Sequence, residues 1–473
     1  MTSNHSGIII SLIKLNKWGE EMVFDKKLPL QERLNFIVYA LSRFVLSVGK
    51  YVYLFAVSYY ILYETGSALY FSVNMAISIA TTVLLLPFSG VLSDFGNKRR
   101  IIITGETMNS IILLGFFLYT MIYDVTLLAI YTVTFLTSMI EPFISNAFQA
   151  AMTELFHKDR IQKVMGYTSA ILSSTVILGP ILGGALFGLL SFNHIIMIFL
   201  IAYIISAALD FLMDFKLHST KVENVENNDE GGGMDRFKRD ISQGFIFIAG
   251  NEVFKSLLLI GALINFMAGV ITIFPEKMMI HELSLQPGTV GIINAIGGLG
   301  VLAGGVAVAR MRGLDHPFLL MKRGMLAFAG LVVLYLLPLY LNGGLISHIL
   351  IIGSVGIGIA LALQFINIPI NLFVQLVTPQ HVKGRVFSVM NLCSMSIMPV
   401  GAIFYGFLYD FELYWLINAA SAVLMIAVVL LFFNEGLLAK SKRMYIAAKT
   451  EAGELERGPA EEDAHPGTDL QSI

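Results

Sequence analysis

The chain has 473 residues, of which 56% are hydrophobic and only 14% are charged. Soluble proteins carry about 25% charged residues, so the composition excludes an ordinary soluble protein. The formal net charge of -2 gives no reason to expect nucleic-acid binding. The one cysteine, Cys393, excludes an internal disulfide framework and a cysteine zinc cluster.

Twelve apolar segments are long enough to cross a membrane, where backbone groups must be satisfied within helices. They lie at about residues 34–62, 69–93, 100–122, 127–152, 164–190, 194–215, 254–278, 288–309, 324–341, 346–376, 386–408 and 413–433. We expect two bundles of six helices, residues 34–215 and 254–433, joined by a polar linker at residues 216–253. The predicted fold class is therefore an all-α polytopic membrane protein.

Residues 1–33 and 434–473 flank the apolar segments. We expect a cytoplasmic segment at the start and a disordered cytoplasmic tail at the end, because the end is acidic and rich in Gly and Pro. The tetrapeptide Trp18-Gly19-Glu20-Glu21 would be encoded by a G- and A-rich stretch, like a bacterial ribosome-binding site. We hypothesise that translation starts at Met22 and that residues 1–21 are not native. A native peptide containing that tetrapeptide, found by mass spectrometry, would contradict this.

The linker has two parts. Residues 223–233 are acidic and glycine-rich, which is typical of a flexible connection. Residues 234–252 place Phe237, Ile241 and Phe245 at helical spacing, so we expect an amphipathic helix. A helix on the cytoplasmic membrane surface and a solvated linker helix both fit this pattern.

Lysine and arginine positions predict the orientation. With both termini in the cytoplasm, all but three of the 31 lysines and arginines lie on the cytoplasmic side. The exceptions are Lys277, expected outside, and Arg43 and Lys50, expected within the first helix. We therefore expect a multi-pass protein of a bacterial inner membrane with both termini cytoplasmic.

The two bundles resemble each other in sequence. Residues 143–166 align without gaps on residues 365–388, and Gly179-Pro180 in the fifth span is matched by Met398-Pro399 in the eleventh. Chance similarity between apolar helices is the alternative. The position of the linker favours a six-plus-six repeat.

The turn between the second and third spans reads Gly-Val-Leu-Ser-Asp-Phe-Gly-Asn-Lys-Arg-Arg over residues 90–100. It resembles the loop between helices 2 and 3 of the major facilitator superfamily, roughly G-x-L-x-D-R-x-G-R-K. The matching positions are Gly90, Leu92, Asp94, Lys98 and Arg99. Phe95 and Asn97 stand where the family has arginine and glycine.

Two further stretches carry the resemblance. Gly179-Pro180-Ile181-Leu182-Gly183-Gly184 resembles the G-P-x-x-G-G motif of antiporters, whose small residues permit close packing. Residues 378–388 resemble the stretch before helix 11 in the macrolide-efflux and enterobactin-exporter branch. The resemblance implies a monomeric transporter of twelve helices without a cofactor, working in the lipid bilayer on a small-molecule substrate.

The resemblance also implies a gate. In this superfamily the aspartate corresponding to Asp94 faces the start of helix 11, here near residues 384–387. A carboxylate at a helix N-terminus stabilises the contact by about 0.3–1 kcal/mol. Gly90, Lys98 and Arg99 would complete the gate, and Lys98 could neutralise Asp94. Alternatively, the cations only determine topology.

Charged side chains inside a membrane cost about 2.5–3.5 kcal/mol each and therefore suggest function. Lys50 and Glu141 lie at similar depth in the first and fourth spans, so we predict an ion pair that a proton on Glu141 would release. Arg43 and Glu106 lie nearer the cytoplasm, and we expect Glu106 to support a network there. A static pair, or charges facing a wet cavity, is the alternative. Asp210 is expected at the membrane interface.

The tenth span carries a polar stripe at helical spacing. Its members Gln364, Asn367 and Asn371 are the expected substrate-binding residues. Polar contacts between helices are the alternative, and this is the expected role of Asn265 and Asn391.

These features predict proton-coupled efflux of amphipathic drugs by alternating access. A lipid, lysolipid or siderophore transporter of the same fold is the alternative, and an uptake symporter fits the antiporter-like motif less well. No glycine-rich phosphate loop with lysine occurs, which argues against ATP hydrolysis by this chain. The histidines are scattered and show no metal-type spacing, so we expect neither an enzyme nor a metal site.

Overall fold

The computed structural model describes residues 30–218, 233–311, 316–341 and 343–457, with only the backbone described for residues 94–95, 233–238 and 452–457. Residues 1–29, most of the expected flexible linker and the last sixteen residues of the tail (458–473) lie outside the described residues. The described ranges are helical and contain no strand.

Six membrane-spanning helices form the N-terminal half. They are α2 (Leu30–Thr65), α3 (Ala68–Phe95), α4 (Lys98–Ile122), α5 (Leu127–Leu155), α6 (Lys158–Leu189) and α7 (Phe192–Leu212).

Six further spans form the C-terminal half, and three of them consist of more than one helical segment. They are α9 (Glu252–Phe266) with α10 (Ala268–Lys277) and η1 (Met278–Glu282), α11 (Pro287–Ala309), α12 (Pro317–Leu334) with α13 (Leu337–Tyr340), α14 (Leu345–Val377), α15 (Lys383–Ser396) with α16 (Met398–Tyr409), and α17 (Tyr414–Phe432). Each predicted span coincides with one of the spans in the structure, so the fold class is confirmed. Helices α6 and α12 begin earlier than predicted. Charged residues in their first two turns lower the local hydropathy, so a prediction based on hydropathy starts these spans too late.

Tight turns join consecutive helices, and local hydrogen bonds explain where they form. Gly66, between α2 and α3, has a φ of 62°, which glycine adopts without steric cost. The side chain of Ser67 then accepts a hydrogen bond from the Tyr70 amide and caps α3. The side chain of Asn97 caps α4 in the same way at the Arg100 amide. The asparagine that departs from the family pattern therefore starts a helix.

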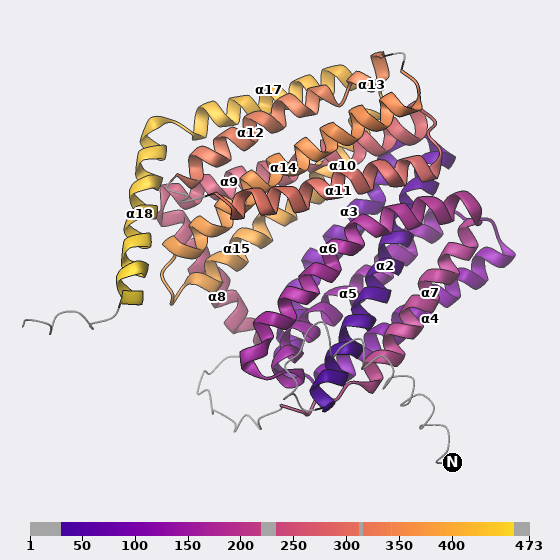
Figure 1. Cartoon of the computed structure of the whole chain (residues 1–473), viewed down its shortest axis with the longest axis horizontal. Helices are drawn as coiled ribbons and strands as arrows, with labels where there is room; N and C mark the ends of the chain where they lie inside the picture. Colours follow the sequence, from indigo (N-terminus) through magenta and orange to yellow (C-terminus); the bar gives the residue numbers. More distant parts are fainter. Residues whose placement is uncertain (1–29, 219–232, 312–315, 342, 458–473) are drawn as a thin grey trace, which may run out of the picture.

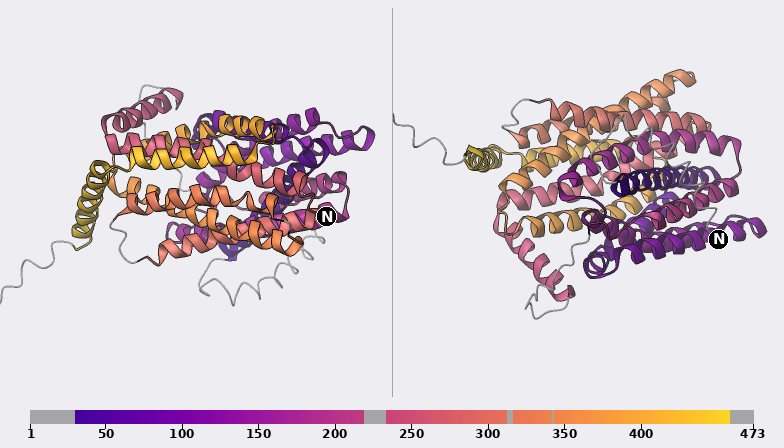
Figure 2. Two further views of the ribbon diagram at one scale, coloured as in Figure 1. Left: turned by 90° about the horizontal axis from the view of Figure 1, so that it is seen from above. Right: turned by 60° about the horizontal axis from the view of Figure 1, so that its bottom comes forward.

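The two halves converge at one end of the molecule and diverge at the other (Figure 1). We call the end with the α2–α3 turn the sealed end, and the end with the α3–α4 turn the motif end. Helix α6 lies along α11, and α3 lies along α16, so these pairs join the halves toward the sealed end. Figure 2 shows the same two bundles from two further directions.

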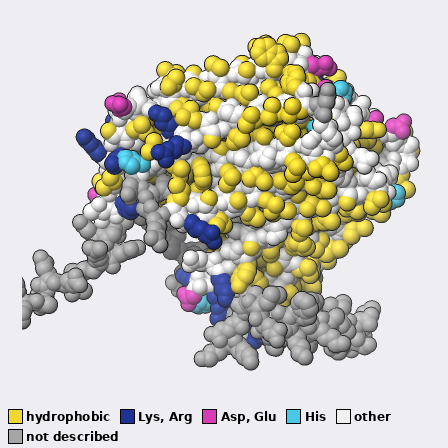
Figure 3. Space-filling model, turned by 45° about the horizontal axis from the view of Figure 1, so that its top comes forward, with side chains coloured by type: hydrophobic (Ala, Val, Ile, Leu, Met, Phe, Trp, Pro, Cys, Tyr) yellow, Lys and Arg dark blue, Asp and Glu magenta, His cyan; other side chains and the backbone are white. Residues whose placement is uncertain are grey.

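The surface fits a membrane environment. Hydrophobic side chains cover the middle of the face in Figure 3, whereas lysine and arginine gather toward one end and acidic side chains lie at both ends. The structure thus contains twelve helical spans of sufficient length and apolarity to cross a bilayer, counted over the described residues.

Two helices at the motif end do not span the membrane. The amphipathic α8 (Gly233–Gly250) packs on the start of α15, where Asp240 lies 2.7 Å from Arg385 Nε. Helix α18 (Glu435–Arg457) replaces most of the disordered tail expected at residues 434–473, so that expectation is wrong for these residues. The physical reason is a packed stripe on α18, on which Tyr445 is 3% exposed and stacks on Phe373 at 6.3 Å.

Candidate functional site

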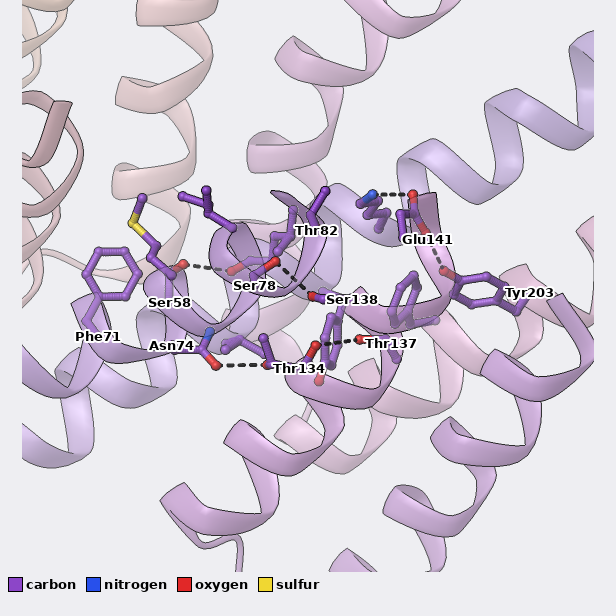
Figure 4. Close-up of a pocket in the computed structure, with 17 residues that line it drawn as sticks. Ser58, Phe71, Asn74, Ser78, Thr82, Thr134, Thr137, Ser138, Glu141 and Tyr203 are labelled. Atoms are coloured by element: carbon purple, nitrogen blue, oxygen red, sulfur yellow. Dashed lines mark hydrogen bonds and ion pairs between the residues drawn. The ribbon is translucent and has the colours of Figure 1, made fainter. Parts of the chain in front are cut away.

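A cavity of about 340 Å³ lies in the N-terminal half, among α2, α3, α5 and α7. Its lining is rich in small polar side chains: Ser58, Asn74, Ser78, Thr82, Thr134, Thr137 and Ser138. Several of them bridge α3 and α5 (Figure 4), as when Thr134 Oγ1 donates to Asn74 Oδ1 at 2.8 Å. Sequence reasoning missed this set, although Asn74, Ser78 and Thr82 recur every four residues on one face of α3.

An ion pair closes one side of this cavity. Lys50 Nζ of α2 lies 2.5 Å from Glu141 Oε1 of α5, and the side chains are 40% and 33% exposed. The Tyr203 hydroxyl donates to Glu141 Oε2 at 3.3 Å and accepts from the Asn109 amide at 3.2 Å (Figure 4). The expected Lys50–Glu141 contact is therefore present, and its coupling role stays a prediction.

A second charge network is largely buried, and only its arginine is partly exposed, at 13%. Arg43 Nη2 lies 2.8 Å from Glu106 Oε1 and 2.6 Å from Asp210 Oδ2, and neither carboxylate side chain is exposed. The guanidinium also lies 3.8 Å over the Phe148 ring. The interfacial position expected for Asp210 is therefore wrong, because Arg43 and the Ser42 hydroxyl, both of α2, donate to its carboxylate within the bundle.

The network holds more negative than positive charge when both carboxyl groups are ionised. Glu106 Oε2 is buried and has no hydrogen-bond partner among the described residues, whereas Oε1 accepts from Arg43 and Ser206. A proton on Glu106 would neutralise the excess charge. A buried carboxylate without full pairing is otherwise costly.

The expected gate residues at the motif end are not assembled by contacts that the structure describes. Lys98 binds Glu154 of α5 at 2.8 Å, within its own half, and its expected neutralisation of Asp94 stays a prediction. Arg99 donates to the carbonyl of Phe211 at 2.9 Å, and Gly90 has open space where a side chain would project. Asp94 lies in the last turn of α3, and its side chain lies outside the described atoms.

The antiporter-like motif packs α6 against two neighbours. A side chain added at Gly179 or Gly183 would meet Tyr51 or Phe55 of α2. One added at Gly184 would meet the carbonyl of Pro287, at the start of α11. Across the same junction, one added at Gly291 of α11 would meet the Pro180 carbonyl. The motif thus brings backbones of the two halves together near the sealed end.

The polar stripe of α14 divides between two cavities. Gln364 lines one of about 350 Å³ with α10, α11 and α12, and donates to the Val301 carbonyl at 3.4 Å. Asn371 lines another of about 130 Å³, and Asn367 borders both. Asn265 and Asn391 line this smaller cavity together with Asn371.

At the sealed end, Asp410 joins the halves, and sequence reasoning missed it. Its carboxylate, at the end of α16, accepts from the Ala68 amide at 2.6 Å and from the Ser67 hydroxyl at 2.6 Å, at the start of α3. Lys277 Nζ lies 3.2 Å from Asp410, and this lysine is buried at the sealed end. The Tyr59 hydroxyl of α2 also donates to the Leu285 carbonyl at 3.0 Å.

Comparisons with known proteins agree with this architecture. The family model described as Major Facilitator Superfamily matches residues 39–402. Macrolide efflux protein A of Streptococcus pyogenes is 21% identical over 388 residues, which cover 80% of this chain and 91% of that protein.

Two solved structures show the same fold at low identity. An inward-facing bacterial homologue of the iron transporter ferroportin has a TM-score of 0.64 and 16% identity, covering 86% of this chain and 99% of that chain. An inward-facing bacterial homologue of the human lysosomal transporter Spinster has a TM-score of 0.63 and 12% identity, covering 88% and 98%. The family match over most of the chain, with the two six-helix halves, makes this protein a member of the major facilitator superfamily of membrane transporters.

Proposed function

We propose that this transporter exports amphipathic drug-like molecules, macrolides among them, in exchange for protons. The observation that carries the proposal is the partly open Lys50–Glu141 pair on the wall of the N-terminal cavity. A charge pair that faces a cavity within the membrane is exposed both to a substrate and to protons. The similarity to macrolide efflux protein A supports the substrate class.

Proton binding at Glu141 would act through Lys50. Uptake of a proton cancels the carboxylate charge, which leaves the lysine amine without its partner at 2.5 Å. The free cation would then favour the conformation in which water or substrate reaches it. Glu106, with its unpartnered buried oxygen, is a second position at which a proton can be held.

Alternating access is supported by the unequal ends of the molecule. We place the motif end in the cytoplasm, because lysine and arginine concentrate there. The sealed end, joined through Asp410 and through α6 with α11, would then face outward. This conformation is inward-facing in the proposed cycle.

The opposite conformation would use Asp94. Helix α15 begins without a side-chain cap, which leaves amide donors free for a carboxylate when the motif end closes. We therefore keep Asp94 as the proposed gate residue.

Drug-resistance profiling tests the proposed function. In a drug-hypersensitive bacterium, expression of the chain is expected to raise resistance to macrolides, and Glu141→Gln to return it to the level of cells without the chain. In proteoliposomes, a pH gradient should drive macrolide export by the parent chain and not by Glu141→Gln. The matched control Glu435→Gln changes an exposed glutamate of α18 and should behave as the parent.

Two results would contradict the proposal. Unchanged resistance to macrolides, tetracyclines, dyes and siderophores with normal membrane abundance would exclude drug export and favour a lipid substrate. Full gradient-driven export by Glu141→Gln would exclude Glu141 as the coupling site.

The proposed gate makes a separate prediction. Asp94→Ala is expected to lower transport severalfold without lowering membrane abundance. The variant loses a contact of about 0.3–1 kcal/mol, and the proposed contact forms only when the motif end is closed. Transport is measured as efflux from preloaded cells and abundance by immunoblot. Efflux equal to that of the parent chain would rule out the gate role.

A further inference from the structure

Three helices of the C-terminal half bring four asparagines to one small cavity. Asn265 comes from α9, Asn367 and Asn371 come from α14, and Asn391 comes from α15. A serine of α15, one turn beyond Asn391, completes the polar lining, and the remaining side chains are apolar. None of the residues that line this cavity carries a charge.

Most of these side-chain amides form no hydrogen bond with other described groups of the protein. Within the described part of the chain, Asn367, Asn371 and Asn391 make no hydrogen bond through their side chains, and all three are exposed. Asn265 donates to the Gly261 carbonyl at 2.9 Å, which leaves its side-chain oxygen free. Polar contacts between helices would consume these groups, so that role does not account for them.

The amides also do not suit lipid. An amide exposed to hydrocarbon loses its hydrogen bonds with water at a cost of several kcal/mol. Convergence of the four on one cavity instead gives them a shared polar partner. The cavity has a volume of about 130 Å³, whereas pockets for whole drug-sized ligands measure about 300–1,000 Å³. It therefore fits one substituent of a larger molecule.

Asparagine presents two N–H donors and one carbonyl acceptor, without charge. Four such groups and a hydroxyl match a substituent that carries several donors and acceptors of its own. An ammonium or carboxylate group would lack a counter-charge here, and burial of an uncompensated ion is costly. The cavity thus differs in chemistry from the Lys50–Glu141 side of the N-terminal half.

We propose that this asparagine cavity is a substrate subsite for an uncharged group that carries hydroxyl and ether oxygens, such as a neutral sugar substituent. The proposal rests on the function proposed above and specifies what the C-terminal half recognises. A transported molecule would place its neutral sugar here and more of its surface toward the neighbouring cavity of about 350 Å³, which Asn367 also borders.

A matched pair of probes tests the subsite: erythromycin, and the derivative that lacks its neutral sugar and keeps its amino sugar. Asn371→Leu and Asn391→Leu remove hydrogen-bonding groups and keep the number and branching of the side-chain heavy atoms. Each is expected to reduce erythromycin efflux about fivefold to tenfold, the effect of one lost hydrogen bond. Each variant should export the truncated probe as fast as the parent chain does. The control Gln375→Leu changes an exposed residue of α14, four positions after Asn371, that does not line the cavity. It should leave the efflux of both probes unaffected.

Binding is measured alongside transport. The rise in Tm of the purified protein with erythromycin should shrink in Asn371→Leu and Asn391→Leu, while the Tm without ligand stays near that of the parent. If the variants lose efflux of both probes equally, or lose efflux of neither, the subsite is overturned and the proposed function still stands. A parent chain that exports neither probe would overturn the proposed function, and the subsite with it.

Discussion

Arg43→Met is expected to lower the free energy of unfolding by about 3–5 kcal/mol, the cost of leaving a buried ionic partner uncompensated. Arg43 is the cation at the centre of the largely buried network, and the side chains of Glu106 and Asp210 are both 0% exposed. Methionine fills similar space but leaves both carboxyl groups in an apolar bundle. The measurement is the Tm of the purified protein in detergent, with membrane abundance as a second readout.

Two variants separate charge from packing. The triple change Arg43→Met, Glu106→Gln and Asp210→Asn removes the whole charged set, and it should recover most of the lost stability because neutral replacement of a buried ion set is often tolerated. Lys50→Met, on the same helix, breaks a pair that is 40% and 33% exposed, so its stability loss should be smaller. An Arg43→Met protein as stable as the parent would show that the network is not needed for folding.

Gly184→Val is expected to abolish transport by keeping the sealed end from closing. The first atom of the new side chain would fall against the carbonyl of Pro287, and backbone at a helix start cannot move aside as a side chain can. Closure of this end requires α6 and α11 to approach at that point. The variant is therefore expected to populate the outward-open conformation.

Thiol labelling measures this shift. In a Cys393→Ser background, Ser58→Cys places a thiol on the wall of the N-terminal cavity. A membrane-impermeant maleimide added outside should label it quickly in Gly184→Val and slowly in the parent chain. Gly188→Val, one turn further along α6, is the matched control, because nothing lies within 4 Å of a side chain added there. Slow labelling and normal transport in Gly184→Val would contradict the prediction.

The twelve spans were predictable because hydropathy and length decide whether a segment can reside in lipid. The Lys50–Glu141 contact was also predictable, since both residues could be assigned a depth along their helices. Depth does not specify which side of a helix faces which neighbour. Asp210 was misplaced for this reason, because its burial depends on the reach of Arg43 across from α2.

Other features depend on contacts between distant parts of the chain. Asp410 carries no local signal of its role, because its partners Ser67 and Ala68 lie in the other half. The asparagine cavity likewise combines α9, α14 and α15, and each helix contributes only one or two of its asparagines. Helix α18 was missed because its apolar stripe is short and lies among charged residues, so composition concealed the surface that packs on Phe373.

The contact at Asp410 bears on how little energy the cycle needs. Asp410 ends α16 and binds the start of α3, whereas Asp94 ends α3 and is proposed to bind the start of α15. The same two spans would thus exchange roles, each supplying the acid at one face and the amide donors at the other. In the proposed cycle, exchange of one such contact for its counterpart would leave the two conformations close in free energy. A proton or a bound cargo molecule would then shift the balance between them.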